Sequence, residues 1–337
     1  MSKMKRAMRT MRAILVVLLV AASPAAASPI RCHHDDIAAL AAIGAAFGGY
    51  CSAWTQRDPE CCGGGIHCDP FTGRVTDLAV FQDANITGTI PDAVARLVHL
   101  RTLKLHHLPA ISGPIPPAIA KLSNLTMLII SWTGVSGPVP SFLGALTKLT
   151  FLDLSFNSLT GVIPASLAAL PNLNGINLSR NRLTGVIPPL LFSKSPDQAS
   201  LVLSHNILNG SIPAEFSAVG FSQIDLSRNA FTGDASALFG RGKELQILDL
   251  SRNAFSFNLS DVELPERLTW LDLSHNAIYG GIPAQVANMS FQTQLFNVSY
   301  NQLCGAVPTG GIMGKFDAYS FQHNKCLCGA PLANLCK

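Results

Sequence analysis

Hydrophobic and polar positions between residues 75 and 308 follow a pattern that returns every 23 to 25 residues. The clearest copy is LDLSFNSLTGVIP, Leu152–Pro164, in which leucines alternate with polar residues along a short extended segment. Ten copies occur, and they start at Leu78, Leu103, Leu128, Leu152, Ile176, Leu201, Ile224, Leu248, Leu271 and Phe296. We expect each copy to form one coil of a stacked array and to place its leucines in a core shared with its neighbours.

The frame L-x-x-L-x-L-x-x-N-x-L at this period is typical of leucine-rich repeats. It predicts an α/β solenoid, a right-handed superhelix of about ten repeats with a parallel β-sheet on its concave side. The Gly-x-Ile-Pro tail predicts a second short strand in each coil, with irregularity in repeats seven and eight, where other residues replace the tail. The Asn of the frame is expected to satisfy backbone groups of a buried turn. It occurs as Asn157, Asn181, Asn206, Asn229, Asn253, Asn276 and Asn301.

The segments around the array have distinct compositions. Residues 1–27 combine five Lys or Arg, a short apolar run and an Ala-x-Ala site, which predicts a cleaved secretory signal. Residues 28–74 and 309–337 are expected to be cysteine caps at the two ends of the repeats, residues 75–308. Within the first cap, Asp35–Phe47 is expected to be a helix whose first amides bond to Asp35 or Asp36. No other apolar run approaches the length of a membrane span, and no second domain is expected.

The nine cysteines form two clusters, five in Cys32–Cys68 and four in Cys304–Cys336. In a secreted chain this predicts disulfides rather than a metal site. Adjacent Cys61 and Cys62 cannot easily bond each other. The shortest pairing is therefore Cys32–Cys61, Cys62–Cys68, Cys304–Cys326 and Cys328–Cys336. Cys51 remains as an odd thiol, either buried and inert or an intermolecular partner.

The net charge and the N-glycosylation sequons limit the classes of partner and the location that the sequence allows. Without the five basic residues of the signal, 19 Lys+Arg face 20 Asp+Glu, so the mature chain lacks the charge expected of a nucleic-acid-binding protein. Seven N-glycosylation sequons support a secretory route. We expect glycans at Asn85, Asn124, Asn209, Asn258 and Asn288. Asn177 and Asn297 project from concave strands, and we expect Asn177 to be unmodified because a glycan there would cover the concave face.

The repeats with Gly-x-Ile-Pro tails between two cysteine caps resemble the polygalacturonase-inhibiting proteins of plants. The matching stretches are GPIPPAIAKLSNL (Gly113–Leu125), GDASALFG (Gly233–Gly240) and NKCLCGAPL (Asn324–Leu332). The resemblance implies a secreted protein of the plant cell wall that binds fungal or insect endopolygalacturonases and blocks pectin cleavage. The chain departs from the family in its short CCGGGIHC loop, in Cys51, and in repeat two, which has one extra residue and no ladder Asn.

Strand alternation and the resemblance together select partner-binding candidates on the concave face. The resemblance matches Asp153 and Asp225 to acidic positions of the family, and Asn174 and Gln246 to positions that vary with specificity. The full set is Trp132, Asp153, Asn174, Arg180, His205, Asp225, Arg228, Gln246, Asp249, Asp272 and Gln294.

Two alternatives stay open for these residues. Asp225, Asp249 and Asp272 should form a ladder on adjacent strands, about 4.8 Å apart. This ladder either faces a basic partner or simply pairs with Arg228 and Arg252. Exposed aromatic side chains here either anchor a partner or stack between coils; we weigh both for Trp132 and favour packing for Phe156.

Catalysis is not expected. A carboxylate ladder can offer the spacing of about 5–5.5 Å used by retaining glycosidases, but nothing in the sequence marks one acid as having a raised pKa. Motifs for phosphate, nucleophile or metal sites are missing from the sequence, and the pairs His33–His34 and His106–His107 lack a third ligand, so we expect neither cofactor nor metal. The alternative to inhibition is a non-inhibitory module that binds peptide or pectin. Pectin would favour Arg180, Arg228, Arg252 and Lys243. We expect a monomer.

Overall fold

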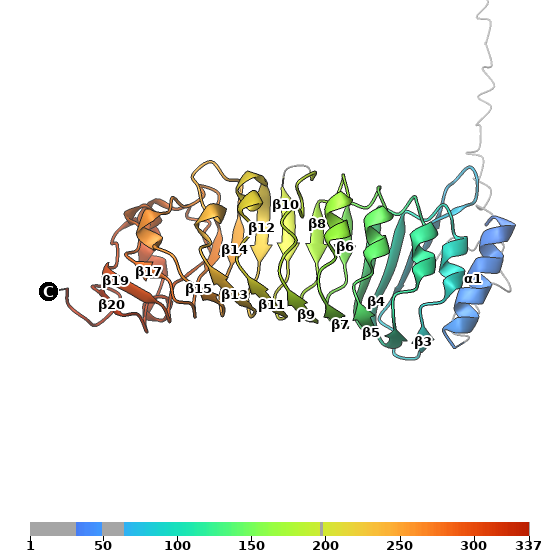
Figure 1. The fold of residues 1–337 in the computed structure, drawn as a ribbon, viewed down its shortest axis with the longest axis horizontal. Coiled ribbons are helices and arrows are strands. Elements are labelled where there is room, and N and C mark those ends of the chain that lie inside the picture. The colour runs from blue at the N-terminus through green and yellow to red at the C-terminus, as the bar shows by residue number, and fades with distance from the viewer. Residues whose placement is uncertain (1–31, 49–63, 196–197, 337) are drawn as a thin grey trace, which may run out of the picture.

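The structure, a computed structural model, describes residues 32–48, 64–195 and 198–336. Short coils stack side by side into one elongated array, with helix α1 (His34–Ala46) at one end and strand β20 (Cys326–Cys328) at the other (Figure 1). Over these ranges, no helix has both the length and the apolar character needed to cross a membrane. The predicted signal, residues 1–27, lies outside the described part of the chain.

Each coil contributes one strand to a long parallel sheet, here called the main sheet. Its strands are β2 (Val75–Phe81), β4 (Thr102–Gly113), β5 (Met127–Pro138), β6 (Phe151–Asp153), β8 (Gly175–Asn177), β10 (Ala199–Val202), β12 (Phe221–Asp225), β14 (Ile247–Asp249), β16 (Trp270–Asp272) and β18 (Leu295–Asn297). Neighbours pair in repeat register, so equivalent residues of successive copies lie beside each other. Strand β1 (Ile66–Cys68) adds an antiparallel edge to β2. The parallel sheet predicted from the repeat frame is confirmed.

A second row of short strands runs along another side of the coils. These side strands are β3 (Gly88–Thr89), β7 (Ser158–Gly161), β9 (Arg182–Gly185), β11 (Ile207–Gly210), β13 (Ala230–Gly233), β15 (Ala254–Phe255), β17 (Tyr279–Gly280) and β19 (Gln302–Ala306). Gly210 shows why the tail requires glycine: its φ is +82°, and a Cβ there would lie 2.8 Å from Val186 Cγ1. The second strand predicted from the Gly-x-Ile-Pro tail is confirmed.

One-turn 3₁₀ helices close most of the coils: η2 (Asp92–Arg96), η3 (Pro117–Lys121), η4 (Ser141–Ala145), η5 (Ala165–Ala169), η6 (Ala214–Ala218), η7 (Ser236–Leu238), η8 (Leu259–Asp261), η9 (Ala284–Asn288), η10 (Gly311–Lys315) and η11 (Ala318–Ser320). In repeats seven and eight, η7 and η8 have three residues where η2 to η6 have five. The irregularity predicted for these repeats is therefore confirmed.

The core is a continuous column of leucine-type residues, and the frame asparagines line its turns. Asn181 is 9% exposed; its Nδ2 donates to the carbonyls of Leu154 and Leu178 at 2.9 and 3.0 Å, and its Oδ1 accepts from the Leu159 amide at 2.9 Å. Equivalent bonds occur at the other six predicted positions. The structure also adds Asn324, which the sequence analysis did not assign to the ladder.

The first cap holds the array differently from the expectation. Helix α1 does not begin with an aspartate cap; its N-cap is His33, whose Nδ1 accepts from the Asp35 amide at 3.3 Å. Asp36 is fully buried and accepts from Arg74 Nη2 and Nε at 2.8 and 3.0 Å and from the Val75 amide at 2.8 Å. A buried carboxylate needs such partners, so Asp36 joins the helix to β2 instead of capping it.

The C-terminal disulfides Cys304–Cys326 and Cys328–Cys336 are present as predicted, with Cα separations of 4.3 and 5.0 Å. The first joins β19 to β20 and so fastens the last pair of strands. Cys32 and Cys68 are disulfide-bonded. Their predicted partners Cys61 and Cys62, and the extra Cys51, lie outside the described residues.

Candidate functional site

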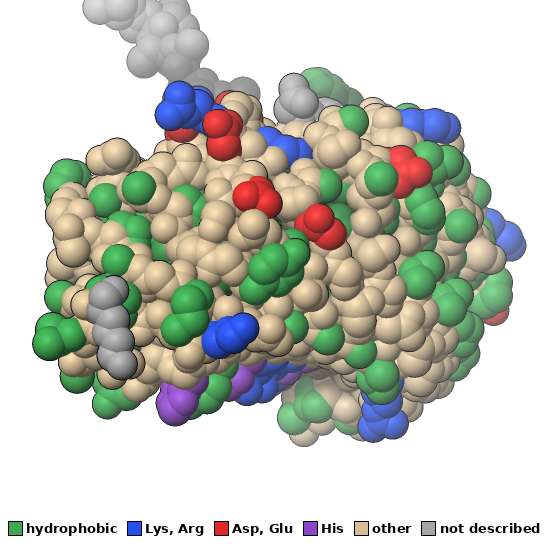
Figure 2. All heavy atoms as spheres, turned by 60° about the vertical axis from the view of Figure 1, so that its left-hand side comes forward, with side chains coloured by type: hydrophobic (Ala, Val, Ile, Leu, Met, Phe, Trp, Pro, Cys, Tyr) green, Lys and Arg blue, Asp and Glu red, His purple; other side chains and the backbone are tan. Residues whose placement is uncertain are grey.

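The outward side of the main sheet, with the turn that follows each strand, is here called the sheet face. It carries all the candidate residues because successive strand residues point to opposite faces of a sheet. Along the outward column, Asp153 pairs with Asn177, Val202 with Asp225, Asp225 with Asp249, and Asp249 with Asp272. In the space-filling view, histidine and basic side chains gather along the lower edge, whereas the acidic side chains are scattered higher in the view (Figure 2).

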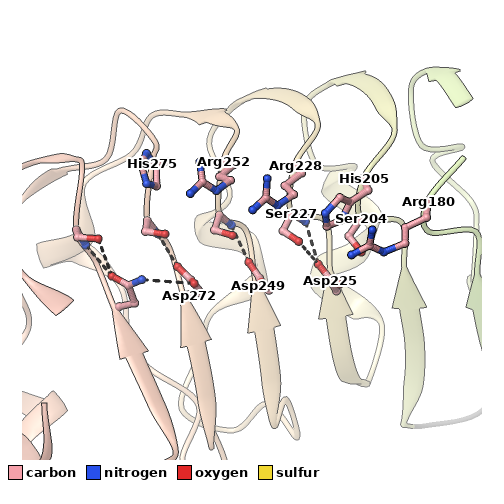
Figure 3. A pocket seen from close by; sticks show the side chains of 14 residues that line it. Arg180, Ser204, His205, Asp225, Ser227, Arg228, Asp249, Arg252, Asp272 and His275 are labelled. Atoms are coloured by element: carbon pink, nitrogen blue, oxygen red, sulfur yellow. Dashed lines mark hydrogen bonds between the residues drawn. The ribbon is translucent and has the colours of Figure 1, made fainter. Parts of the chain in front are cut away.

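The predicted carboxylate ladder of Asp225, Asp249 and Asp272 is present on three adjacent strands (Figure 3). Each Asp accepts through Oδ1 from the amide two residues later, at 3.0, 2.9 and 2.9 Å respectively. Asp153 makes the same bond to the Ser155 amide at 2.9 Å. These acids therefore fix the turn that follows their own strand as well as presenting charge.

A second column follows the strands, with one residue per coil. Its backbone is left-handed, with φ between +53° and +59°, which is uncommon for residues other than glycine. Hydrogen bonds to the next coil hold it; the Arg228 amide, for example, donates to the Ser251 carbonyl at 2.9 Å. In the first coil this position is occupied by Gln82. The ten members after it end in rings or guanidinium groups and are here called the planar column: His107, Trp132, Phe156, Arg180, His205, Arg228, Arg252, His275, Tyr300 and His323.

The ends of the planar column are stacks of rings. Trp132 lies on Phe156 with ring centroids 3.6 Å apart, and the Arg180 guanidinium lies 4.9 Å from the Phe156 centroid. At the other end, Tyr300 lies between His275 and His323, each 4.1 Å from it between centroids. Stacking between coils, which the sequence analysis favoured for Phe156, is thus present, and it also involves Trp132, which remains 44% exposed.

Two hollows open on the sheet face. The larger cavity, of about 540 Å³, brings together six of the predicted residues: Arg180, His205, Asp225, Arg228, Asp249 and Asp272. The smaller hollow, of about 400 Å³, is lined by Trp132 and Phe156 and shares Arg180 with the larger one. Asp153, Asn174, Gln246 and Gln294 lie on the sheet face but line neither hollow.

The larger cavity also contains residues that the candidate set omitted. Arg252 and His275 belong to the planar column and line the cavity between the predicted residues. The sequence indicates both residues by their position directly before a ladder Asn. His323 occupies the same position before Asn324. Lys243 does not join them, because its Nζ donates to the Ser217 carbonyl at 2.9 Å and it lines neither hollow.

Among the acids of the cavity, Asp249 is set apart by its pKa. Burial, and then the charges of Asp225 and Asp272, raise its pKa to about 6 although it bonds to Ser251. The pKa values of His205 and His275 are lowered, first by burial and then by neighbouring arginines. One acid is thus distinguished from its neighbours, which the sequence did not indicate.

Pairing of these acids with arginine is not what the structure shows. In the described part of the chain, no ion pair joins Asp225, Asp249 or Asp272 to a guanidinium; the Arg–acid pairs found there are Arg74 with Asp35 and Asp36, Arg241–Glu266 and Arg267–Glu244. The alternative in which Arg228 and Arg252 form ion pairs with these acids is therefore wrong. Both charge types remain available in the cavity.

His33 and His34, for which the sequence indicated no third metal ligand, lie close to Asp35. Their ring nitrogens and a carboxylate oxygen of Asp35 lie within 4.8 Å of one another. The three residues are consecutive and mostly exposed, and Asp35 already contacts both rings. Nothing else at this helix start indicates a metal site.

Comparison with known proteins places the chain. A leucine-rich-repeat family model matches residues 148–170, 172–193 and 267–289. Polygalacturonase inhibitor 2 of Arabidopsis thaliana is 52% identical over 310 residues, 91% of this chain and 93% of that protein. Leucine-rich repeat protein FLOR 1 of Arabidopsis thaliana is 46% identical, over 90% and 93% of the two chains.

A solved structure has a similar fold. The crystal structure of a plant ice-binding protein has a TM-score of 0.87 and 43% sequence identity, covering 91% of this chain and 99% of that one. The chain therefore belongs to the family of plant polygalacturonase inhibitors, which are leucine-rich-repeat proteins and not enzymes.

Proposed function

We propose that this protein is secreted to the plant cell wall, where it binds microbial endopolygalacturonases through its sheet face and limits pectin degradation in defence. The support is its membership of a family whose relatives are named polygalacturonase inhibitors. The signal at residues 1–27, the cysteine caps at residues 28–74 and 309–337 and a monomeric state are parts of the same proposal.

The observation that carries the proposal is the larger cavity of the sheet face. Six of the predicted partner-binding residues line it, including the three stacked carboxylates of Asp225, Asp249 and Asp272. An enzyme that cleaves an anionic polymer must present cationic groups around its cleft. Carboxylates that form no ion pair with arginine among the described residues would attract such a surface, which raises the rate of association and fixes the orientation of the complex.

The smaller hollow would supply the apolar part of the contact. Trp132 is 44% exposed and stacked on Phe156, so it offers a large side chain that loses little freedom on binding. Trp, Tyr and Arg are the residues that most often dominate binding energy. Trp132 and Arg180 would therefore anchor the partner next to the charged cavity. Asp153 and Asn174 would extend the contact on the neighbouring strands, and Gln246 and Gln294 would extend it farther along the sheet face.

The proposal is tested by measuring reducing sugar released from polygalacturonate by a panel of fungal and insect endopolygalacturonases, with and without the purified protein. We expect dose-dependent inhibition of at least one enzyme, and weaker inhibition at high salt because exposed charges are screened. A triple variant Asp225→Asn, Asp249→Asn, Asp272→Asn should inhibit that enzyme poorly.

The matched control removes the same number of acids elsewhere. Asp92, Glu215 and Glu263 are exposed residues that line neither hollow. A triple variant Asp92→Asn, Glu215→Gln, Glu263→Gln should inhibit like the natural protein. A folded protein that inhibits no enzyme of a broad panel would contradict the proposal.

A second candidate is a non-inhibitory module that binds pectin or a peptide. It is favoured by the guanidiniums of Arg180, Arg228 and Arg252, which lie in one cavity and form no ion pair with the residues that the structure describes. Similarity to FLOR 1, a relative not named as an inhibitor, also favours it. Salt-sensitive binding of oligogalacturonate without enzyme, lost in an Arg228→Gln, Arg252→Gln variant, would support this candidate.

A further inference from the structure

The larger cavity holds two opposed sets of charge. Asp225, Asp249 and Asp272 come from β12, β14 and β16, and their neighbours Arg180, Arg228 and Arg252 come from the planar column (Figure 3). With all three acids ionised and the histidines neutral, these charges cancel. A proton gained by one acid therefore raises the summed charge of these six groups from zero to +1.

Asp249 is the acid placed to make that change. It is the middle member of the ladder, with Asp225 in register on one side and Asp272 on the other. Besides those two carboxylates, the cavity around it is lined by Arg228 after β12, His275 after β16, and Ser251 and Arg252 on its own turn. Within the described residues no guanidinium lies close enough to pair with it.

The histidines of the cavity can also make it more positive at acid pH. His205 Nδ1 is buried, and no hydrogen-bond partner for it occurs among the described residues. Burial and the neighbouring arginines keep the pKa values of His205 and His275 below the ordinary value of histidine. Any charge that the imidazoles gain on acidification is positive, so it adds to the effect of a proton on Asp249.

We propose that this cavity is a pH-dependent charge switch centred on Asp249. It binds a cationic protein surface more tightly near neutral pH than at acid pH, and a polyanion, such as a polyuronate, more tightly at acid pH than near neutral pH. The inference deepens the proposed function, because the cationic surface is that of the polygalacturonase proposed above. Both ligands use one cavity, so each would exclude the other.

Linkage sets the direction of the effect. Burial raises the pKa of Asp249 to about 6, so between pH 5 and pH 7 this carboxyl changes from mostly neutral to mostly ionised. A cationic ligand prefers the ionised form, so its affinity rises with pH and its binding releases a proton. A polyanion prefers the neutral form, and its affinity falls over the same range. A ligand that moves this pKa by one unit changes its affinity about tenfold.

The test uses two probes whose own charge is constant over this range. Oligolysine is the polycation, and oligogalacturonate is the polyanion; their dissociation constants are measured at pH 5 and pH 7 at low salt. For the natural protein we expect oligolysine to bind up to about tenfold more tightly at pH 7, and oligogalacturonate up to about tenfold more tightly at pH 5. Asp249→Asn should remove most of both differences.

Asp249→Asn keeps an acceptor for the Ser251 amide, so the turn is retained. The matched control is Asp153→Asn, which loses an acid with the same bond to its own turn but does not line the cavity. It should keep the pH dependence. The inference is overturned if Asp249→Asn retains the full pH dependence of the natural protein.

The same preparations are then assayed against any polygalacturonase that the natural protein inhibits. Inhibition should weaken from pH 7 to pH 5 in the natural protein and remain flat in Asp249→Asn. If no enzyme is inhibited but the probes behave as expected, the proposed function fails and the switch stands. If an enzyme is inhibited but neither probe responds to Asp249→Asn, the function stands and the switch fails.

Discussion

The indole of Trp132 lies flat on the ring of Phe156, with centroids 3.6 Å apart and ring planes inclined by 14°. The two residues sit on adjacent coils at equivalent positions of the repeat, and Phe156 in turn carries the Arg180 guanidinium. Aromatic pairs of this kind contribute about 0.5–1.5 kcal/mol beyond the area they bury. The stack therefore fixes an aromatic and a cationic group side by side on the sheet face.

Replacing Trp132 should weaken inhibition more than stability. In Trp132→Ala we expect the inhibition constant to rise roughly thirtyfold, which corresponds to a loss of about 2 kcal/mol in the free energy of binding, as for a binding anchor. Titration of enzyme activity measures this effect. Thermal unfolding should show a smaller loss, about 0.5–1.5 kcal/mol from the lost stack, because Trp132 is 44% exposed. Tyr319, which is 74% exposed and lies in η11, gives the control: Tyr319→Ala should leave inhibition unchanged.

Asp249 should make stability depend on pH. Its pKa is raised to about 6 from an ordinary 3.8, so the folded state holds this proton more tightly than the unfolded chain does. The folded state consequently loses stability as pH rises from about 4 to 6. Asp249→Asn should be more stable than the natural protein by about 2–3 kcal/mol at pH 7.5 and equal to it at pH 3.5, as measured by denaturant unfolding. Equal gains at both pH values would contradict this assignment.

The asparagine ladder should be costly to interrupt. Asn181→Ala removes donors to the carbonyls of Leu154 and Leu178 and the acceptor for the Leu159 amide, and it leaves these groups buried. Each unsatisfied group costs about 1–3 kcal/mol, so we expect a loss of at least about 3 kcal/mol in the free energy of unfolding. Asn172→Ala loses one exposed bond, to the Thr147 carbonyl, and should cost less than about 1 kcal/mol.

The buried pair Asp36–Arg74 should govern the first cap. Arg74→Leu leaves the fully buried Asp36 carboxylate without its bidentate partner and should cost about 3–5 kcal/mol. The double variant Asp36→Leu, Arg74→Leu should be more stable than that single variant, because no uncompensated charge remains. Thermal unfolding compares the two, and limited proteolysis near α1 reports opening of the cap. A double variant less stable than Arg74→Leu would contradict the argument.

Glycan occupancy should follow the state of each Asn side chain. Asn177 and Asn297 each accept from the amide and hydroxyl of the buried serine two residues later, so a glycan there would disrupt the turn after the strand. Asn85, Asn209 and Asn288 are exposed, whereas Asn124 and Asn258 donate to Val98 and Asp261. Glycopeptide mapping should find the exposed three most occupied and Asn177 and Asn297 unmodified. High occupancy at Asn177 would also argue against partner binding on the sheet face.

Much of the candidate site could be predicted because the site repeats with the fold. Strand alternation placed Asp225, Asp249 and Asp272 on one face, and the repeat period placed them on adjacent strands, as the register shows. Arg252 and His275 were at equivalent positions but were left out of the candidate set, although they line the cavity. The difference arose because a repeat specifies where a side chain lies, whereas membership of a cavity depends on its neighbours.

The start of helix α1 differs from what its local sequence predicts. Asp36 stands at the start of a helix, where an acid usually caps the free amides. The structure instead buries it against Arg74, 38 residues later in the chain. A distant partner of opposite charge outweighs a local amide when both are buried, since the charge must be compensated.

By itself, the sequence determined the coil, the core and the turn ladder of this protein, because each depends on residues that recur within about 25 positions and contact their equivalents in the next copy. Only the tertiary structure decided which charges remain unpaired, which aromatic rings stack and which carboxyl resists ionisation. Those properties depend on burial and on distances between side chains of several coils, as at Asp249, where burial and two neighbouring acids together raise the pKa to about 6.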